Sequence, residues 1–247
     1  MLRRFENQVA IIIGGARGIG HAIAERITKE GGIVCVLDVL QSELDELIKE
    51  KIVQNVFVVD ITNEVLLNET IQNILELHGR LDILINSAGI VGPTATKIEY
   101  YSSLDFQKII NINLNGAFNI TKAVLPQMVQ QNYGRILHIA SIGGKEGNPG
   151  MVGYTASKAG LMGLVKGVGK EYADTGVTVN GLAPAVIATP MNKDTDPEML
   201  KYMTSKIPMG RLGTVEEVAS LVCWIVSKEA TFNTGFIFDI SGGRATF

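Results

Sequence analysis

Short runs of apolar and β-branched residues recur along the chain, and longer amphipathic segments separate most of them. Such short runs are typical of strands buried on both faces of a parallel sheet, while apolar positions three or four residues apart are typical of helices. The pattern therefore predicts an α/β fold. The strand-like runs are 9–13, 33–37, 55–59, 81–85, 134–140, 177–182 and 236–238, and the helix-like segments include 19–29, 64–77, 153–173 and a stretch from Val215.

The length and apolar content of the chain suit one large domain. It has 247 residues, of which 46% are hydrophobic, so it can bury a substantial core. The sequence contains no internal repeat and no linker-like segment. We therefore expect a single domain over residues 1–247.

Charge and hydropathy restrict the partners of the protein. The net charge is -3 with no basic run, which argues against nucleic acid. No apolar stretch approaches the roughly 18 residues that span a bilayer, and the N-terminus lacks the apolar core of a signal peptide. Cys35 and Cys223 lack metal-ligand spacing, so we expect two buried reduced thiols and no metal site. These features predict a cytoplasmic protein that binds neither nucleic acid nor a membrane.

A glycine-rich loop follows the first predicted strand directly. Gly14, Gly18 and Gly20 allow a tight turn, close approach of the backbone to a pyrophosphate and close packing of the next helix on the sheet. The N-terminus of that helix supplies N–H groups and positive dipole. Asp38 ends the second strand, where a dinucleotide ribose is expected. The unit predicts dinucleotide binding more strongly than a simple glycine-rich turn.

Two residues bear on the choice of dinucleotide. The Asp38 carboxylate accepts hydrogen bonds from ribose hydroxyls and repels the 2′-phosphate of NADP. Arg17 favours NADP, because its side chain can reach that phosphate, although it also suits a surface position near the pyrophosphate. The carboxylate at the strand end is the more decisive feature, so we predict NAD.

Polar and small residues also follow the third and fourth predicted strands. Asp60 is placed to hydrogen-bond an adenine amine, or simply to cap its own turn. Asn86-Ser87-Ala88-Gly89 closes the fourth strand, and its small residues allow a cofactor ring to approach the backbone. Both segments lie where parallel sheets bind ligands.

Tyr154 and Lys158 carry the candidate chemistry. They are four residues apart in a helix-like run, so they share one face. A cation roughly 4 Å from a phenolate favours it by about 4 kcal/mol, which lowers a tyrosine pKa by up to about three units. Such a tyrosine serves as an acid or base near neutrality. The alternative without a catalytic role is an interfacial tyrosine and a solvated lysine on an ordinary helix.

Two further residues extend this candidate site. Ser141 lies at the end of the fifth strand, where ligands of parallel sheets bind. Asn113 lies among alternating asparagines in a helical region, which predicts a local bulge or a bound water. None of the histidines has a catalytic partner nearby in sequence, and we expect His138 to be a core strand residue.

The order and spacing of these motifs resemble those of the short-chain dehydrogenase/reductase family over almost the whole chain. The family implies seven parallel strands in one Rossmann-type, doubly wound domain with helices on both faces, assembled as a homotetramer. Three residues depart from its usual pattern. They are Ile13 before the glycine loop, Ser87 within the fourth-strand motif, and Ala185 after Pro184. None removes a catalytic group.

The resemblance also implies roles for individual residues. Tyr154 exchanges the proton with the substrate oxygen, and Ser141 orients that oxygen. Lys158 lowers the pKa of Tyr154 and holds the nicotinamide ribose, while Asn113 holds a water that links Lys158 to solvent. Residues 190–208, centred on Lys193–Lys206, resemble the substrate lid. The expected cofactor-binding set is Gly14, Arg17, Gly18, Ile19, Gly20, Asp38, Asp60, Ile61, Asn86, Ala88, Gly89, Tyr154, Lys158, Ile187 and Thr189, in which Ile187 and Thr189 fix the carboxamide.

We therefore predict an NAD-dependent oxidoreductase that acts on a secondary alcohol or its ketone, with a hydroxylated or sugar-derived acid as the preferred substrate. One alternative is a 3-oxoacyl-[acyl-carrier-protein] reductase of fatty-acid synthesis that uses NADPH. Another is a cofactor-binding regulatory protein without activity. Arg244, after Gly242-Gly243, is expected to reach a substrate pocket, to contact another subunit, or to be solvated.

Overall fold

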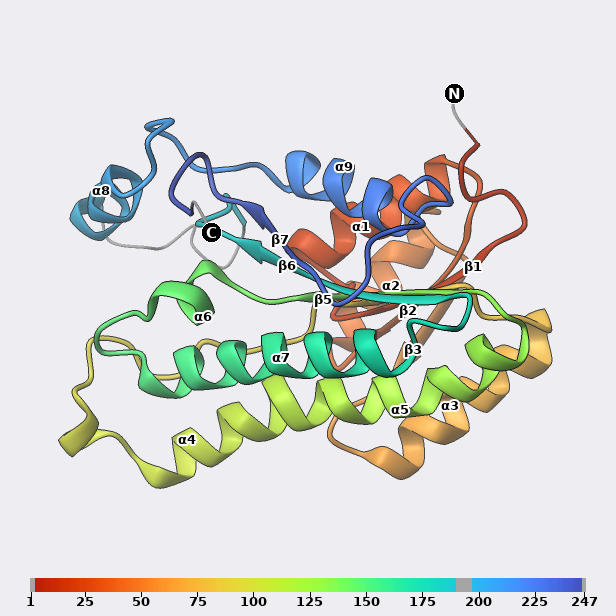
Figure 1. Cartoon of the computed structure of the whole chain (residues 1–247), viewed down its shortest axis with the longest axis horizontal. Coiled ribbons are helices and arrows are strands. Elements are labelled where there is room, and N and C mark those ends of the chain that lie inside the picture. The colour runs from red at the N-terminus through yellow and green to blue at the C-terminus, as the bar shows by residue number, and fades with distance from the viewer. Residues whose placement is uncertain (1–2, 190–196, 246–247) are drawn as a thin grey trace.

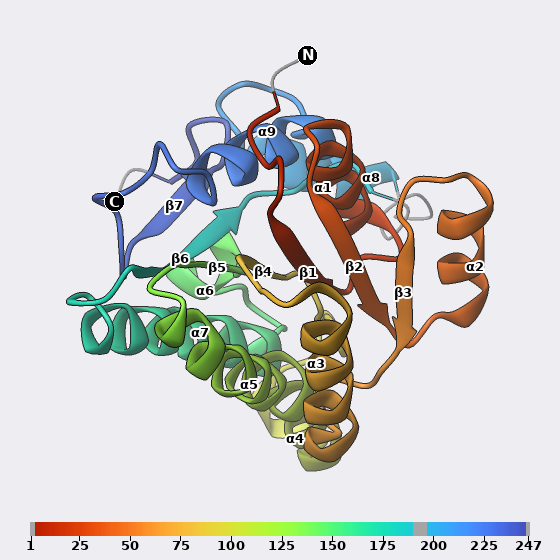
Figure 2. The ribbon, with the colours of Figure 1, turned by 90° about the vertical axis from the view of Figure 1, so that its right-hand side faces the viewer.

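A computed structural model describes residues 3–189 and 197–245. Its centre is a parallel sheet of seven strands in the order β3-β2-β1-β4-β5-β6-β7. Figure 1 shows the whole chain, and the strands can be followed side by side in Figure 2. This architecture confirms the predicted doubly wound α/β fold. The strands are β1 Val9–Ile13, β2 Ile33–Asp38, β3 Asn55–Val58, β4 Ile83–Asn86, β5 Gly134–Ile139, β6 Val177–Pro184 and β7 Ile237–Ile240.

Helices cover both faces of the sheet (Figure 2). On one face, apolar residues of α1 and α9 pack against the strands in one core cluster, and on the other face α3 and α5 form a second cluster. Helix α7 lies beside α5 on that second face (Figure 1). The helices are α1 Gly18–Lys29, α2 Gln41–Lys49, α3 Glu64–His78, α4 Ser103–Ile110, α5 Gly116–Gln130, α6 Ile142–Glu146, α7 Val152–Glu171, α8 Pro197–Ser205 and α9 Val215–Ile225.

The strand order reverses beside β1, which pairs with β2 on one side and with β4 on the other. Ligands of open parallel sheets bind at such a reversal, beyond the carboxyl ends of the strands. The glycine loop, Asp38, Asn86 and Ser141 all lie at these ends. The topology therefore brings the residues predicted from separate motifs to one edge of the sheet.

Several element boundaries differ from the sequence prediction. The fourth strand begins at Ile83 rather than 81, because the buried Asp82 carboxylate accepts the N–H of Val9 at 2.8 Å and pairs with Arg80. Helix α2 was not predicted. Short helix α6 was not predicted either; it follows Ser141, whose hydroxyl caps it.

Strands β6 and β7 extend beyond their predicted ends, to Pro184 and Ile240, because residues 181–184 and 237–240 pair with each other in register. Within the described residues, no helix is long and apolar enough to cross a membrane. The same residues contain no group of three or more His, Cys, Asp or Glu side chains that could hold a metal ion.

Candidate active site

The glycine loop between β1 and α1 is shaped by close approaches that only glycine permits. Gly14 and Gly18 have φ values of 71° and 60°, which other residues rarely adopt. A Cβ on Gly14 would lie 2.6 Å from the backbone nitrogen of Ala88, and one on Gly20 would collide with the carbonyl oxygen of Gly14. The loop thus lies against the segment after β4 and leaves the N-terminus of α1 open to a phosphate, an arrangement that fits a dinucleotide.

Asp38 is a fixed anion at the end of β2. Its Oδ2 accepts the N–H of Ala16 at 3.1 Å, and its Oδ1 accepts the N–H groups of Val39 and Leu40 at 2.8 and 3.3 Å. These bonds join the carboxylate to the glycine loop. The predicted position beside a ribose site is therefore well defined.

Asp60 follows β3 and caps its own turn in the structure. Its Oδ1 accepts both the N–H and the hydroxyl of Thr62, at 2.8 and 2.7 Å, and the residue is exposed. The neighbouring Ile61 is buried and packs against Gly116 at the start of α5. The predicted contact of Asp60 with adenine stays a prediction.

Asn86 is held by a chain of buried hydrogen bonds. Its Oδ1 accepts the N–H of Ala88 at 3.2 Å, and its Nδ2 lies 3.2 Å from His138 Nδ1. His138 Nε2 lies 3.0 Å from the hydroxyl of Thr121, which itself donates to the carbonyl of Ala117 at 2.7 Å. His138 therefore carries its proton on Nε2 and accepts from Asn86 through Nδ1.

His138 is a core residue, as predicted, but it also supports the site. It is fully buried, and burial followed by the charge of Lys158 lowers its pKa to about 3. The imidazole is thus neutral, and it sets the direction of the Asn86 amide. Sequence analysis missed this role because Asn86 and His138 come from different strands.

Ser141 and Tyr154 meet at the junction of α6 and α7. The Ser141 hydroxyl caps α6 by accepting the N–H of Gly143 at 3.1 Å, and it is hydrogen-bonded to the Tyr154 phenol. A Cβ on Gly144 would lie 2.8 Å from the backbone carbon of Lys158, so α6 lies directly on α7. This close packing places the serine beside the tyrosine.

Lys158 is buried one turn further along α7. Its Nζ donates to the carbonyl of Ile139 at 2.8 Å and lies 5.9 Å from the centre of the Tyr154 ring. A Cβ on Gly89 would lie 3.3 Å from this Nζ, so the segment after β4 also borders the lysine. Burial lowers the pKa of Lys158 to about 8.

The pKa of Tyr154 differs from the sequence expectation. Burial raises it, and the influence that lowers it comes from the Ser141 hydroxyl rather than from Lys158. The expected net lowering of this pKa is wrong because burial of the phenol raises it; the Lys158 ammonium donates to the carbonyl of Ile139 and lies 5.9 Å from the centre of the Tyr154 ring. The two side chains do share one face of the helix, as predicted.

Asn113 lies in a π-helical turn, η2 (Asn111–Asn115), between α4 and α5, so the predicted bulge is confirmed. Its Oδ1 accepts the N–H of Ile90 at 2.8 Å, and its Nδ2 donates to the Ile90 carbonyl and the Ser157 hydroxyl, each at 2.9 Å. The amide thus ties the segment after β4 to α7. The water expected beside it stays a prediction.

Ile187 and Thr189 follow β6. Ile187 forms a parallel bridge with Gly213 and is buried, and Thr189 lies 3.8 Å from where a Cβ of Gly18 would be. The segment therefore lies over the glycine loop, near the expected position. Of the predicted lid, residues 190–196 lie outside the described part of the chain, and helix α8 occupies residues 197–205.

Arg244 joins the C-terminal tail to α6. Its Nε and Nη2 donate to Glu146 Oε2 at 2.9 and 2.7 Å, and its side chain is only 9% exposed, so the expectation of a solvated arginine is wrong. Beside it, Lys145 pairs with Asp239 of β7 at 2.8 Å. Two ion pairs therefore fasten the helix that Ser141 caps to β7 and the tail.

The chain is similar to known oxidoreductases over nearly its full length. It is 43% identical over 244 residues to the 2-dehydro-3-deoxy-L-rhamnonate dehydrogenase (NAD(+)) of Sphingomonas sp., covering 99% of this chain and 98% of the relative. It is 36% identical over 246 residues to the 3-oxoacyl-[acyl-carrier-protein] reductase FabG of Thermotoga maritima, covering 97% and 98%. The crystal structure of an NAD+-bound xylitol dehydrogenase superposes with a TM-score of 0.91 at 29% identity, covering 97% of this chain and all of that one.

A family model described as enoyl-(acyl carrier protein) reductase matches residues 14–245. This match spans the glycine loop, the π-helical turn and the paired Tyr154 and Lys158. The chain therefore belongs to the short-chain dehydrogenase/reductase family.

Proposed function

We propose that residues 1–247 form one dinucleotide-binding and catalytic domain, an NAD-dependent oxidoreductase that interconverts a secondary alcohol and its ketone. The observation that carries this proposal is the convergence of Ser141, Tyr154 and Lys158 beside Gly89, at the edge of the sheet that also holds the glycine loop. The glycine loop and Asp38 would hold the dinucleotide, and Ile187 with Thr189 would hold its carboxamide.

The side chains divide the proton chemistry among themselves. Nicotinamide, when bound, supplies the hydride acceptor for oxidation or the hydride donor for reduction. In oxidation, Tyr154 removes the proton from the substrate hydroxyl, and Ser141 donates a hydrogen bond to the substrate oxygen. Lys158, whose pKa burial lowers to about 8, is mainly protonated at pH 7 and would hold the hydroxyls of the nicotinamide ribose. Asn113 would hold a water on the route from Lys158 to solvent.

Acidic side chains around the expected adenosine ribose favour NAD over NADP. Asp38 is held in place by three backbone N–H groups. Glu43 adds a second acidic side chain in the first turn of α2, and hydrogen bonds from Ser42 and the backbone, followed by the charge of Arg17, lower its pKa. A 2′-phosphate bound beside the glycine loop would be repelled by the Asp38 carboxylate.

For the substrate we propose a hydroxylated or sugar-derived acid. The support is the 43% identity to a dehydrogenase whose name gives 2-dehydro-3-deoxy-L-rhamnonate as its substrate. The purified protein should reduce NAD with this compound, and it should prefer this acid to neutral polyols. Preference for a neutral polyol such as xylitol would contradict the acid assignment while leaving the reaction class intact.

The second candidate is a 3-oxoacyl-[acyl-carrier-protein] reductase, supported by the 36% identity to the Thermotoga maritima enzyme. It differs from the first in both cofactor and substrate. Reduction of an acetoacetyl thioester with NADPH, faster than any reaction with NAD and sugar acids, would establish it. A regulatory protein without activity is a third candidate, which the retention of Asn113, Ser141, Tyr154 and Lys158 disfavours and which any robust turnover eliminates.

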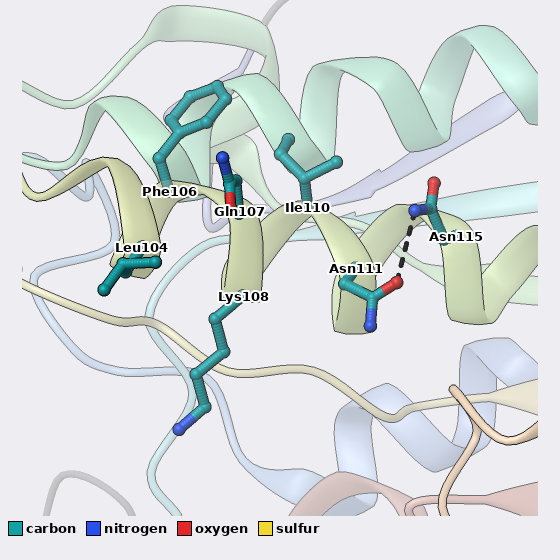
Figure 3. Close-up of a pocket in the computed structure, with 7 residues that line it drawn as sticks. All are labelled: Leu104, Phe106, Gln107, Lys108, Ile110, Asn111 and Asn115. Carbon is teal, nitrogen blue, oxygen red and sulfur yellow. Dashed lines mark hydrogen bonds between the residues drawn. The ribbon is translucent and has the colours of Figure 1, made fainter.

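We also propose a homotetramer, on the basis of the family. An open hollow of about 620 Å³ follows α4 and η2, and Figure 3 shows the residues that line it. Leu104 and Phe106 there, and Phe118 on α5, are 77%, 37% and 50% exposed. Exposed apolar side chains along α4 and α5 suit contact with a second copy of the chain. Sedimentation equilibrium should give four times the mass of the chain, and a stable monomer would contradict the proposal.

A cytoplasmic location is proposed as well, and it is supported by Cys35 and Cys223, which are both buried and unpaired. Burial raises the pKa of each thiol to about 12, so both are unreactive at neutral pH. Fractionation of the native cells, with immunodetection of the protein, tests the location.

A further inference from the structure

The Glu217 carboxylate accepts hydrogen bonds from several residues of the loop between α8 and α9 and so fixes its shape. Oε2 of Glu217, in the first turn of α9, accepts the N–H of Thr214 and Nη1 of Arg211, each at 2.9 Å, and its Oε1 accepts Nη2 of Arg211 at 2.6 Å. The Thr214 hydroxyl accepts the N–H of Glu217 at 3.2 Å, which completes a capping box. We call Arg211 and Glu217 the loop clamp.

The loop held by the clamp forms a short ladder with the segment after β6. Gly213 donates its N–H to the carbonyl of Val186 at 3.1 Å and accepts the N–H of Ala188 at 2.8 Å. These two bonds flank the bridge between Gly213 and Ile187. The backbone of residues 186–188 is therefore positioned by a loop whose own shape depends on Glu217.

Side-chain packing extends this connection to the glycine loop. A Cβ on Gly213 would lie 2.6 Å from Cδ1 of Ile187, so the Ile187 side chain packs directly against the glycine, and Ile187 is 6% exposed. Thr189, two residues on, faces Gly18 across 3.8 Å, measured from an added Cβ on the glycine. The segment 186–189 thus lies between the clamped loop and the start of α1.

We propose that Glu217 and Arg211 are positioning residues for the nicotinamide half of the cofactor site. They act through Gly213 on Ile187 and Thr189 and touch no reacting atom. The inference rests on the proposed function, in which Ile187 and Thr189 hold the carboxamide.

The clamp affects only the nicotinamide half of the cofactor site, because other elements hold the adenosine and pyrophosphate half. The pyrophosphate and adenosine sites use the glycine loop and Asp38, which are held by β1, β2 and the segment after β4. Helix α9 packs directly against α1 (Figure 1), so the clamp starts from a firm base. Loosening it moves the segment 186–189 and leaves the glycine loop in place.

The test compares two ligands that share the adenosine and pyrophosphate groups. NADH carries the nicotinamide, and ADP-ribose lacks it. In Glu217→Gln, the amide oxygen still caps α9, but the charge that pairs with Arg211 is lost. Arg211→Met breaks the pair from the other side. Both variants should bind NADH about fivefold more weakly than the wild type, which corresponds to the loss of an exposed bidentate ion pair. Their affinity for ADP-ribose should stay within about twofold of the wild-type affinity.

Hydrogen exchange in the cofactor-free protein tests the ladder itself. The Ala188 amide, which donates to Gly213, should exchange faster in both variants than in the wild type. Lys29→Met is the matched control, because it removes the ion pair that Lys29 makes with Glu25 on α1. The side chains of Lys29 and Glu25 are 55% and 41% exposed, close to the 54% and 42% of Arg211 and Glu217. The control should change neither the NADH affinity nor the Ala188 exchange rate.

Equal weakening of NADH and ADP-ribose, or no weakening of either, would overturn the inference, as would unchanged exchange at Ala188. A wild-type protein that does not bind NADH would instead refute the proposed function. The exchange experiment remains informative about the ladder in that case, so the two failures are distinguishable.

Discussion

The buried ammonium of Lys158 should make the wild-type protein less stable at neutral pH than a variant without it. Burial lowers its pKa from 10.5 to about 8, and a difference of 2.5 units corresponds to about 3 kcal/mol at 1.36 kcal/mol per unit. Its hydrogen bond to the Ile139 carbonyl offsets part of this cost, because a bond to a charged group contributes roughly 1.5–3 kcal/mol. Lys158→Met should therefore match or exceed the wild-type stability at pH 7 and lose activity.

The pH dependence gives the sharper test. Between pH 8 and 10.5 the unfolded lysine holds a proton that the folded lysine has lost, so wild-type stability rises with pH across this window relative to Lys158→Met. The penalty is fully present below pH 8. Between pH 7 and pH 10, urea unfolding should therefore show the stability of the wild type increasing by about 2.5 kcal/mol relative to that of Lys158→Met. Lys166→Met, which removes an exposed lysine from the same helix, is the control and should keep the wild-type slope.

Parallel stability curves for the wild type and Lys158→Met would refute this reasoning. They would mean that Lys158 keeps its ordinary pKa despite its burial, through a partner that compensates the charge. In that case the lysine would also be less suited to changing its charge near neutral pH.

Further predictions concern the site and its support. Tyr154→Phe should lower turnover by orders of magnitude and leave the dissociation constant of NADH unchanged, because only the proton donor is removed; near-normal steady-state turnover would end the mechanism. Asp38→Ala should lower the ratio of kcat/KM for NAD to kcat/KM for NADP, and it can make NADP the preferred cofactor. A wild type that prefers NADP would favour the oxoacyl reductase assignment. His138→Leu should lower the free energy of unfolding by about 1–3 kcal/mol, since the amide of Asn86 loses its buried partner, and thermal unfolding with no loss would contradict that role.

The sequence by itself determined the elements whose signals are local. Continuous apolar runs predicted the strands, because strands buried on both faces need apolar side chains in succession. The glycine loop predicted the first β-α-β unit, since Gly14 and Gly18 need positive φ values and Gly20 has no room for a Cβ. The four-residue spacing of Tyr154 and Lys158 placed both on one face of α7, and the asparagines around Asn113 predicted the bulge that the π-helical turn forms.

Only the tertiary structure decided what depends on contacts between distant segments. The start of β4 shifted because Asp82 bonds to the first strand, a contact that no local pattern encodes. Burial raises the pKa of Tyr154, and the burial of that side chain depends on how distant segments of the chain pack around α7. The bond between Asn86 and His138, and the hold of Glu217 on the loop beside Ile187, join segments through side-chain geometry. Such contacts depend on the distances between packed elements, and sequence spacing measures distance only within a single helix or strand.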